Sequence, residues 1–262
     1  MDPRALVLYG QGINCDNETS RILESAGARP EKVLLSQLVT RRKRTGDYDM
    51  LAIPGGFSYG DDLGAGTVMA VYLKHGLGND ILEFVQAGKP VIGICNGFQM
   101  LVKLGLLPGL DGDYRTRKAA LTNNDSGMFD DRWVRLAIDS QSPCIFTKGI
   151  DWLELPVRHG EGKFYAEPQT IGRIKEGRLA VARYAGPDNG ANPGYPWNPN
   201  GSLDDIAGIC DPTGRVFGLM PHPEAATEVH HYPTWTRDRA AAEDNAARAR
   251  QIIRNAVEYV RG

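Results

Sequence analysis

The sequence is poor in cysteine and has no long hydrophobic run. Its 262 residues include four cysteines, which are scattered and never stand in the Cys-x-x-Cys spacing of a zinc site: Cys15, Cys95, Cys144 and Cys210. Their scatter also argues against a disulfide framework and fits a reducing compartment. No apolar segment has the length needed to span a bilayer, and the first residues, MDPRALVLYG, show no signal-peptide pattern. We therefore expect a cytoplasmic protein with no metal site and no membrane contact.

The charges are balanced, which removes another class of partner. The chain has 30 basic and 32 acidic residues, and a net charge of −2 gives no reason to expect binding to nucleic acid or to an anionic membrane. Hydrophobic residues make up 42% of the chain and charged residues 24%, as in an ordinary globular protein. A chain of 262 residues allows one large α/β domain or two small ones. Because neither a linker nor an internal repeat divides it, we expect a single domain over residues 1–262.

Strand-like and helix-like segments alternate in the first part of the chain. Short apolar runs predict strands at 5–10, 50–56 and 91–95, and helical spacing of apolar residues is present at 18–28, 66–76 and 80–88. Strands separated by helices predict an open, mostly parallel sheet with helices on both faces. After about residue 120 the chain becomes richer in predicted strands, at 132–138, 152–160, 178–186, 205–211 and 215–224, followed by an Ala-rich helix at 237–262. The predicted fold is thus α/β with a more β-rich second half.

One of these strands leads directly into a helix through a cysteine. The apolar run VIGI ends in Cys95, Gly93 and Gly97 lie on either side of it, and a helical pattern follows from Phe98. A strand that turns sharply into a helix forms a nucleophile elbow, in which glycines leave room beside the reacting residue. The N-terminus of a helix also favours a thiolate over a thiol. The segment therefore predicts either a nucleophilic cysteine or a buried core cysteine.

A thiolate nucleophile needs a histidine and a group that orients it. Two His-x-Glu sequences offer both, His159-Gly160-Glu161 and His222-Pro223-Glu224, and extended backbone would bring each pair to one side. The strand before His222, VFGLM, is apolar throughout, as expected inside a parallel sheet, whereas the strand before His159 is mixed and reads as peripheral. We therefore favour His222 as the base and Glu224 as its orienting group. The remaining histidines, His75, His230 and His231, are expected at the surface.

Oxyanion stabilisation requires backbone N–H donors near the nucleophile. The Gly55-Gly56 pair follows a predicted strand, and the amide of Asn96 directly follows Cys95. Cys15 is a competing nucleophile because GINCDN also follows a strand, although no glycine elbow frames it. The basic run RRKR at 41–44 is predicted to be a solvated face or loop rather than a phosphate contact.

Several of these motifs together resemble those of a known enzyme family. Gly93-x-Cys95-x-Gly97-x-Gln99 together with His222-x-Glu224 resembles the class I glutamine amidotransferases, and more narrowly the glutaminase subunit of phosphoribosylformylglycinamidine synthase. The stretches similar to that subfamily cover almost the whole chain: GQGINCDNE, PGGFSYGDDLGAG, GICNGFQMLVKLGLLPG, HGEGKF, NPNGSLDDIAGICD and GLMPHPE. GFSYGD and NPNGS are the most discriminating, because other class I amidotransferases lack them.

The resemblance implies a flavodoxin-like fold and a role for each motif residue. It implies that Cys95 attacks the side-chain amide of L-glutamine, that His222 is base and later acid, and that Glu224 orients it. It further implies that Gly56 and Asn96 lend backbone amides to the oxyanion and that Gln99 helps to hold the glutamine. The thioester is then hydrolysed.

The resemblance also implies partners. Ammonia would pass to a large synthase subunit of de novo purine biosynthesis, which uses ATP to convert formylglycinamide ribonucleotide to the amidine, and a small third subunit would bridge the two. Because the chain has no Gly-rich phosphate loop, no cofactor is expected in it, and ATP and Mg²⁺ are expected on the synthase.

Two rivals remain open. Another class I glutaminase or a γ-glutamyl hydrolase would work without a partner, whereas a regulatory module with this fold would have lost Cys95, His222 or Glu224, all of which are present. The role of His159-Gly160-Glu161-Gly162 is undecided between substrate or synthase contact and a simple hairpin turn. For the C-terminal segment after residue 227 we expect packing on the sheet.

Overall fold

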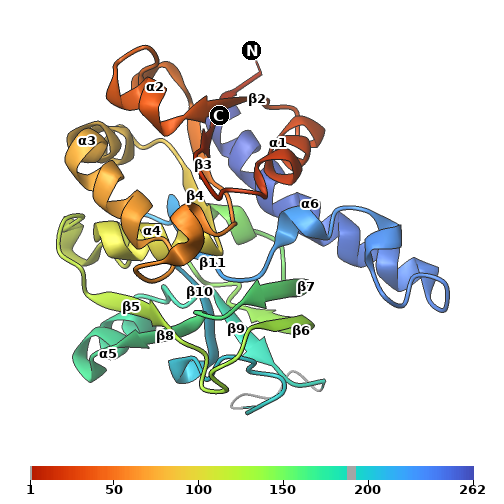
Figure 1. Ribbon diagram of the computed structural model, residues 1–262. Coiled ribbons are helices and arrows are strands. Elements are labelled where there is room, and N and C mark those ends of the chain that lie inside the picture. Colours follow the sequence, from red (N-terminus) through yellow and green to blue (C-terminus); the bar gives the residue numbers. More distant parts are fainter. Residues whose placement is uncertain (1, 188–192) are drawn as a thin grey trace.

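A computed structural model describes residues 2–187 and 193–262, in which nine strands form one sheet (Figure 1). Five neighbouring strands form its parallel half: β2 (Arg29–Leu34), β1 (Arg4–Tyr9), β3 (Met50–Ile53), β4 (Val91–Ile94) and β11 (Val216–Leu219). The remaining four continue the same sheet with antiparallel pairing: β10 (Ile206–Cys210), β9 (Ala182–Ala185), β6 (Asp130–Ile138) and β7 (Trp152–His159). The predicted α/β fold with a β-rich second half is confirmed.

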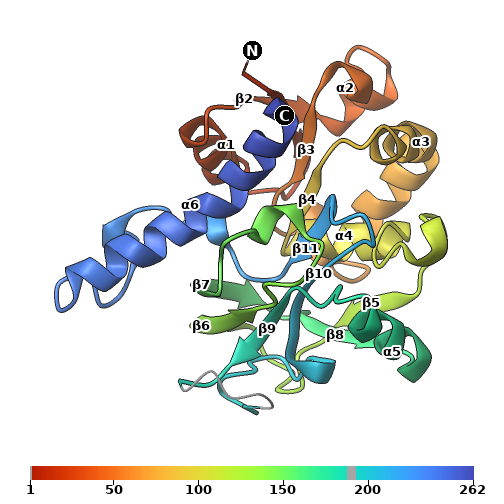
Figure 2. The same cartoon turned by 180° about the vertical axis from the view of Figure 1, so that it is seen from behind.

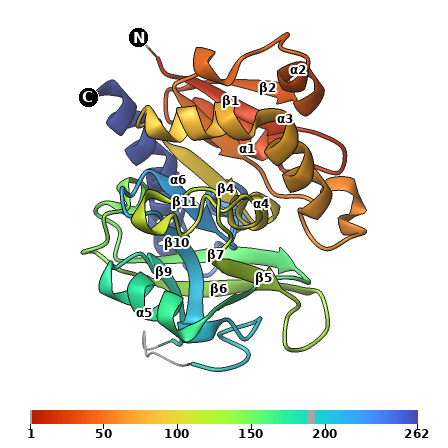
Figure 3. The same ribbon diagram turned by 90° about the vertical axis from the view of Figure 1, so that its left-hand side faces the viewer.

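Helices cover both faces of the parallel half (Figures 1 and 2). On one side lie α3 and α4, which pack on each other, and on the other side lie α1 and α6, which also touch. Their bounds are α1 (Asp16–Ser25), α3 (Thr67–Gln86), α4 (Asn96–Leu104) and α6 (Arg239–Arg261). Figure 3 shows α3 crossing the parallel half, whereas α5 (Pro168–Glu176) lies near the antiparallel strands at the far end of the molecule.

Several short elements were not predicted from the sequence. They are β2, the helix α2 (Leu35–Val39), α5, and a separate two-stranded sheet of β5 (Ala119–Thr122) and β8 (Lys163–Ala166). The strand β2 lies at the sheet edge, contains Pro30 and exposes charged side chains, so it has no apolar run. The two helices expected at 66–76 and 80–88 are one continuous helix, α3.

The relative position of β4 and β11 is the feature that places the site. The two strands are parallel neighbours in register, with Gly218 opposite Gly93 and Leu219 opposite Ile94. Their carboxyl ends therefore lie side by side, and the residues that follow them, Cys95 and the 221–224 segment, start at one edge of the sheet. The prediction that VFGLM lies inside the parallel sheet next to VIGIC is confirmed, as is the peripheral place of β7.

The C-terminal helix α6 is amphipathic and packs on the rest of the fold. It packs mainly on the short helix Ile145–Thr147 and also on α1 and β7. Its buried apolar side chains recur at helical spacing: Ala242, Ala246, Ala249, Ile252, Ile253, Ala256 and Val257. Asp238 caps its first turn by accepting a hydrogen bond of 3.0 Å from the Ala241 amide. Arg261 at its other end donates to the carbonyl of Gly27 and approaches Asp2, so both chain ends meet (Figure 1). Within the described parts of the chain, no helix has the length and apolar character that crossing a membrane requires.

Replacing Gly97 tests how closely α4 must approach the sheet. A Cβ atom on Gly97 would lie 1.9 Å from the backbone oxygen of Ile53 in β3. We predict that Gly97→Ala lowers the free energy of unfolding by about 1–3 kcal/mol, because α4 has to move away from β3. Gly78→Ala in α3 is the matched control. Across residues 2–187 and 193–262 no atom outside its own helix lies within 4 Å of that Cβ, so its stability should stay equal or rise by up to about 1 kcal/mol. Denaturant unfolding measures both, and equal losses would contradict the prediction.

Candidate active site

Cys95 occupies a strained turn between β4 and α4. Its backbone has φ 51° and ψ −106°, a conformation that non-glycine residues rarely adopt. The Cys95 amide donates a 2.8 Å hydrogen bond to the Leu219 carbonyl at the end of β11, which ties the turn to the neighbouring strand. A Cβ on Gly93 would lie 2.6 Å from the Gly97 carbonyl oxygen, so neither flanking position has room for a side chain. The predicted strand–elbow–helix geometry is confirmed.

His222 and Glu224 form a buried pair just after β11. The Nδ1 atom of His222 lies 2.6 Å from Oε1 of Glu224, and each residue is only 2% exposed. The His222 amide donates a 2.9 Å hydrogen bond to the carbonyl of Pro156 in β7, which fixes the backbone there. The expected pairing of the two side chains in His222-x-Glu224 is therefore present.

The cysteine and the histidine meet across Gly55. A Cβ atom on Gly55 would lie 2.7 Å from Cε1 of His222 and 3.4 Å from Cβ of Cys95, so the two side chains flank the same backbone. Burial opposes a charge on His222, but the Glu224 carboxylate, followed by Cys95 and Cys15, outweighs it and raises the pKa of His222 well above its ordinary value. The favoured state of His222 is an imidazolium next to the Cys95 sulfur, and this arrangement can attack a carbonyl carbon and then protonate a leaving amine.

A small cavity opens beside these groups. It measures about 150 Å³ and includes Cys95, His222 and Gly56 in its lining, with the exposed rings of Phe57 and Phe129 at its rim. The Cys95 thiol points toward the Arg158 carbonyl oxygen at 3.8 Å, so β7 supplies one wall. Nucleophile, base and a glycine with unusual backbone (φ 145° at Gly56) thus share one space.

Asn96 and Gln99 lie behind the cavity and hold loops in place. The Asn96 amide group donates to Oδ1 of Asp61 at 3.1 Å and to Oε1 of Gln99 at 2.9 Å. Gln99 in turn donates to the Glu161 carbonyl at 2.6 Å and is 3% exposed. The Gln99 side chain is thus bonded to Asn96 and Glu161. Its predicted contact with the substrate glutamine stays a prediction. The oxyanion roles of the backbone amides of Gly56 and Asn96 likewise stay predictions.

Two acidic residues complete this network: Asp61, which the sequence did not single out, and Glu161, which the sequence offered only as an orienting group for His159. Oδ1 of Asp61 accepts from the Gly66 amide at 3.1 Å, and Oε2 of Glu161 accepts from the Ala65 amide at 3.0 Å. Burial raises the pKa of Asp61 above its ordinary value. Positive φ angles at Tyr59 (53°) and Asp61 (54°) strain the same loop. The loop after β3 is thereby fastened to α4 and to the HGEG turn. The signal was present in SYGD and HGEG, but nothing local shows that these two motifs touch.

His159 is a buried neutral histidine, close to the site but differently held. Its Nδ1 lies 3.2 Å from Oδ1 of Asn124, and Asn124 also binds the His159 carbonyl and the Gly162 amide. Burial, followed by the charge on His222, lowers the pKa of His159 to about 3. A Cβ on Gly162 would lie 2.2 Å from the His159 ring, so this glycine is required by a compact turn.

The other candidates from the sequence separate clearly. Cys15 lies in the site: its thiol would be 3.4 Å from a Cβ on Gly55, and it lines the same small cavity as Cys95. Cys144 and Cys210 lie elsewhere in the core, where a hydrogen bond between their thiols, together with burial, raises the pKa of Cys210. The surface positions expected for the remaining histidines are confirmed: His75, His230 and His231 are exposed.

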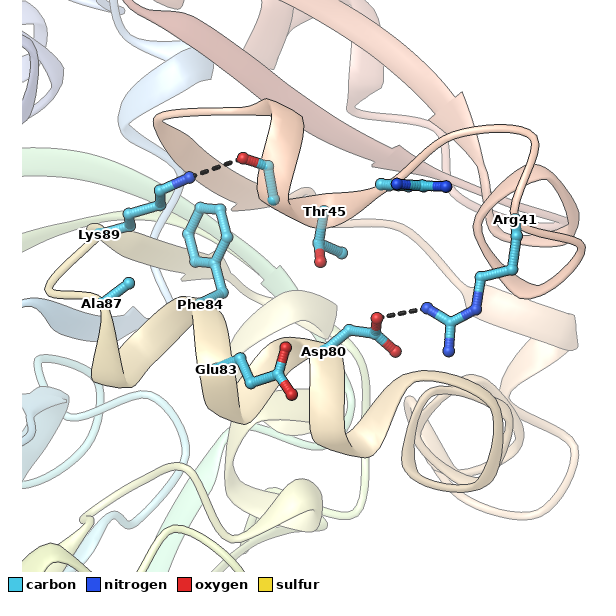
Figure 4. Close-up of a pocket in the computed structure, with 9 residues that line it drawn as sticks. Arg41, Thr45, Asp80, Glu83, Phe84, Ala87 and Lys89 are labelled. Atoms are coloured by element: carbon cyan, nitrogen blue, oxygen red, sulfur yellow. Dashed lines mark hydrogen bonds and ion pairs between the residues drawn. The ribbon is translucent and has the colours of Figure 1, made fainter.

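The basic run at 41–44 is a surface turn with structural ion pairs. Arg41 pairs with Asp80 of α3, and Lys43 pairs with Glu31 at 2.5 Å. A cavity of about 520 Å³ lies beside it, and its lining shares no residue with the small cavity at Cys95 (Figure 4). Lys89 on its rim donates to the carbonyl of Gly46, and Figure 4 shows the Arg41–Asp80 pair closing the other end. The predicted solvated loop is confirmed.

The fold and this site agree with comparisons to known proteins. Residues 2–260 match the family model of the CobB/CobQ-like glutamine amidotransferase domain. Two solved structures of low sequence identity share the fold, both of them glutamine amidotransferases. One is from Thermotoga maritima (TM-score 0.56, 16% identity, 99% of this chain and 98% of that one), and the other is from Methylobacillus flagellatus (TM-score 0.55, 16% identity, 99% and 95%). The chain belongs to the glutamine amidotransferase family.

Full-length relatives narrow the assignment within that family. Phosphoribosylformylglycinamidine synthase subunit PurQ of Methanococcus maripaludis is 42% identical over 98% of this chain and 97% of its own length. The same subunit of Dehalococcoides mccartyi is 44% identical over 98% of both chains. In the PurLQS structure of Thermotoga maritima, a chain of 30% identity matches with a TM-score of 0.73 over 99% of both. The predicted assignment to the phosphoribosylformylglycinamidine synthase glutaminases is confirmed.

The buried neutral state of His159 predicts a pH effect on stability. Its folded pKa of about 3 lies below the unfolded value of 6.5, so at acid pH the unfolded chain binds a proton that the folded chain refuses. Stability is therefore lost as pH falls below 6.5, by roughly 2 kcal/mol at pH 5 from this residue. His159→Gln should flatten the curve of unfolding free energy in this range, and the exposed His75→Gln should leave it unchanged. Parallel curves for His159→Gln and wild type would refute the assignment.

Proposed function

We propose that this chain is the glutaminase subunit of a phosphoribosylformylglycinamidine synthase, hydrolysing L-glutamine at Cys95 and supplying ammonia to a synthase subunit. The observation that carries the proposal is the buried Cys95–His222–Glu224 arrangement at the ends of two adjacent parallel strands. The relatives that carry the name of this synthase subunit match the chain over nearly their whole length, which supports a role in the same pathway.

In the first half-reaction, the Cys95 thiolate attacks the side-chain amide carbon of glutamine. The carbonyl oxygen becomes an oxyanion, for which the backbone amides of Gly56 and Asn96 are the donors. His222, already protonated, gives its proton to the departing nitrogen, so ammonia leaves and a γ-glutamyl thioester remains on Cys95. Glu224 keeps the ring oriented and its charge compensated throughout.

In the second half-reaction, water replaces ammonia. His222, now neutral, takes a proton from water as the hydroxyl attacks the thioester carbon. The same amides of Gly56 and Asn96 receive the second oxyanion. Its collapse expels the Cys95 thiolate and releases glutamate, which restores the starting ion pair. The hydrogen bonds from Gln99 to Glu161 and from Ala65 to Glu161 hold the wall of the site during both steps.

The synthase is proposed to dock over the mouth of the small cavity. Phe57 and Phe129 both line that cavity, are 43% and 53% exposed, and have ring centroids 6.1 Å apart. Met128 beside them is 67% exposed. Exposed aromatic side chains that gather at one place mark a protein interface, and a partner seated here would receive ammonia without its release to solvent. ATP and Mg²⁺ belong to that partner in this proposal, with no cofactor in this chain, a small bridging subunit in the complex, and a cytoplasmic location.

An electrophilic glutamine analogue tests the catalytic assignment. A diazoketone analogue should alkylate Cys95 and leave Cys15 unmodified in peptide maps, because only Cys95 stands in the elbow beside His222. Cys95→Ala should take no label. His222→Ala should slow labelling by about 100-fold or more, whereas His159→Gln should slow it far less, because His159 holds a turn rather than a proton. Label that persists in Cys95→Ala and disappears in Cys15→Ser would reverse the assignment.

Stimulation of glutaminase by the synthase tests the docking surface. We expect a low rate of glutamine hydrolysis by the chain alone and an increase of roughly 10²-fold or more when the synthase is present. A site that is active without the synthase would hydrolyse glutamine without using the ammonia. Phe129→Asp should reduce the ratio of stimulated to unstimulated rate by at least about tenfold by burying a charge in the interface. Tyr165→Asp on β8, which is also exposed but does not line the cavity, is the control and should keep the ratio. A full ratio in Phe129→Asp would rule this surface out.

A further inference from the structure

A second thiol reaches the catalytic imidazole. Cys15 stands directly before α1, and its amide donates to the Gly55 carbonyl at 3.3 Å, which holds it against the loop after β3. Its sulfur, a ring nitrogen of His222 and a carboxylate oxygen of Glu224 all lie within 4.8 Å of one another. All three residues are buried, at 8%, 2% and 2% exposure. The proposed glutaminase chemistry uses His222 and Glu224 but assigns nothing to Cys15.

Among the described residues, two atoms of this cluster that can ligate a metal ion are buried without a hydrogen-bond partner. In the part of the chain that the structure describes, neither Nε2 of His222 nor Oε2 of Glu224 makes a hydrogen bond, although both atoms are buried. The Cys15 thiol donates a 3.4 Å hydrogen bond to Oδ1 of Asn14, which a metal ion would replace. Buried polar atoms are ordinarily satisfied, and these two belong to residues that cluster with the Cys15 sulfur, so their lack of a hydrogen bond indicates a ligand.

The donor set fits a thiophilic divalent cation. Sulfur, imidazole nitrogen and carboxylate oxygen are the three ligand types of protein zinc sites, and a tetrahedral ion with bonds of about 2.0–2.3 Å holds its ligands roughly 3.5 Å apart. The present separations of at most 4.8 Å require a closure of about 1 Å. A fourth position remains for water or for the Cys95 thiolate, which lies against the same ring. The chemistry excludes Mg²⁺ and Ca²⁺, which prefer all-oxygen sites.

The site also has a route to solvent that avoids the small cavity. A wider cavity of about 560 Å³ is lined by Cys15 and Glu224, and its outer wall carries Glu18, His230 and His231. His230, His231 and Glu18 are exposed and offer ligand atoms along this route. The lining also contains Arg21 and Arg158, whose charges oppose the entry of a cation. The small catalytic cavity and this wider one have Asn14, Cys15 and Arg158 in common, which places Cys15 at the boundary between them.

We propose that Cys15, His222 and Glu224 bind Zn²⁺ and that the bound ion inhibits the glutaminase. Zn²⁺ replaces a proton on the imidazole of His222 and the thiol proton of Cys15, both of which pass to solvent, and it draws the Glu224 carboxylate away from its contact with Nδ1. His222 then no longer exchanges protons with Cys95 or with the leaving nitrogen. The inhibition rests on the function proposed above, whereas the binding of the ion does not. Separate measurements therefore distinguish failure of one from failure of the other.

Zinc binding is measured first, without any use of activity. Competition against a chromophoric chelator should give about one Zn²⁺ per chain for the wild type and for Cys95→Ala, which has no nucleophile. Cys15→Ser and Cys15→Ala should weaken binding by tenfold or more, because loss of a ligand exceeds the 10–100-fold effect typical of outer-shell partners. Cys144→Ser is the matched control: Cys144 is also a buried thiol, it pairs with Cys210 rather than with His222, and its variant should bind Zn²⁺ like the wild type.

Inhibition is then measured on the complete complex with the synthase. Zn²⁺ should reduce the glutaminase rate of the wild type, chelator should restore it, and Cys15→Ser should need at least tenfold more Zn²⁺ for the same fractional loss relative to its own zinc-free rate. Equal Zn²⁺ affinity in Cys15→Ser and wild type, or absence of binding in Cys95→Ala, would overturn the site. So would binding that survives in Cys15→Ser and is lost in a His230→Ala, His231→Ala double variant. Tight binding with an unaffected rate would overturn the inhibition.

Discussion

A carboxylate that holds a proton on a buried imidazole underlies the rest of this structure. His222 and Glu224 are both almost fully buried, and Oε1 of Glu224 lies 2.6 Å from Nδ1 of His222. At this distance the carboxylate compensates a positive charge on the ring. Burial alone would expel the proton. With the Glu224 carboxylate on one side and the Cys95 sulfur on the other, the ring keeps its proton and can pass it to a leaving nitrogen.

The strand order of the sheet brings Cys95, His222 and Glu224 together. Two parallel neighbours, β4 and β11, end at the same edge, and the hydrogen bond from the Cys95 amide to the Leu219 carbonyl locks the elbow to the strand that carries the histidine. The antiparallel half then contributes a wall, because the Pro156 carbonyl holds His222 and the Arg158 carbonyl faces Cys95. The parallel half supplies the reacting groups, and the antiparallel half encloses them.

Sequence reasoning succeeded where the geometry is local. The glycines around Cys95 and the apolar strand before His222 each predict their own surroundings, because tight turns and buried strands leave direct traces in residue type. It failed where function depends on contacts between distant segments. Cys15 lies at the site through a backbone contact with Gly55, and Glu161 joins through bonds to Ala65 and Gln99, and none of these pairs has a spacing pattern. The edge strand β2 was not predicted for a different reason, because a half-exposed strand has no continuous apolar run in its sequence.

The protonation state of His222 in the resting enzyme is the most direct test of this account. In protein labelled with ¹⁵N-histidine, nitrogen chemical shifts distinguish an imidazolium from a neutral ring. At about pH 8, above the ordinary pKa of histidine, we predict an imidazolium at His222 in the wild type and a neutral ring in Glu224→Gln. A neutral His222 in the wild type, or an imidazolium that persists unchanged in Glu224→Gln, would contradict the claim that Glu224 holds the proton there.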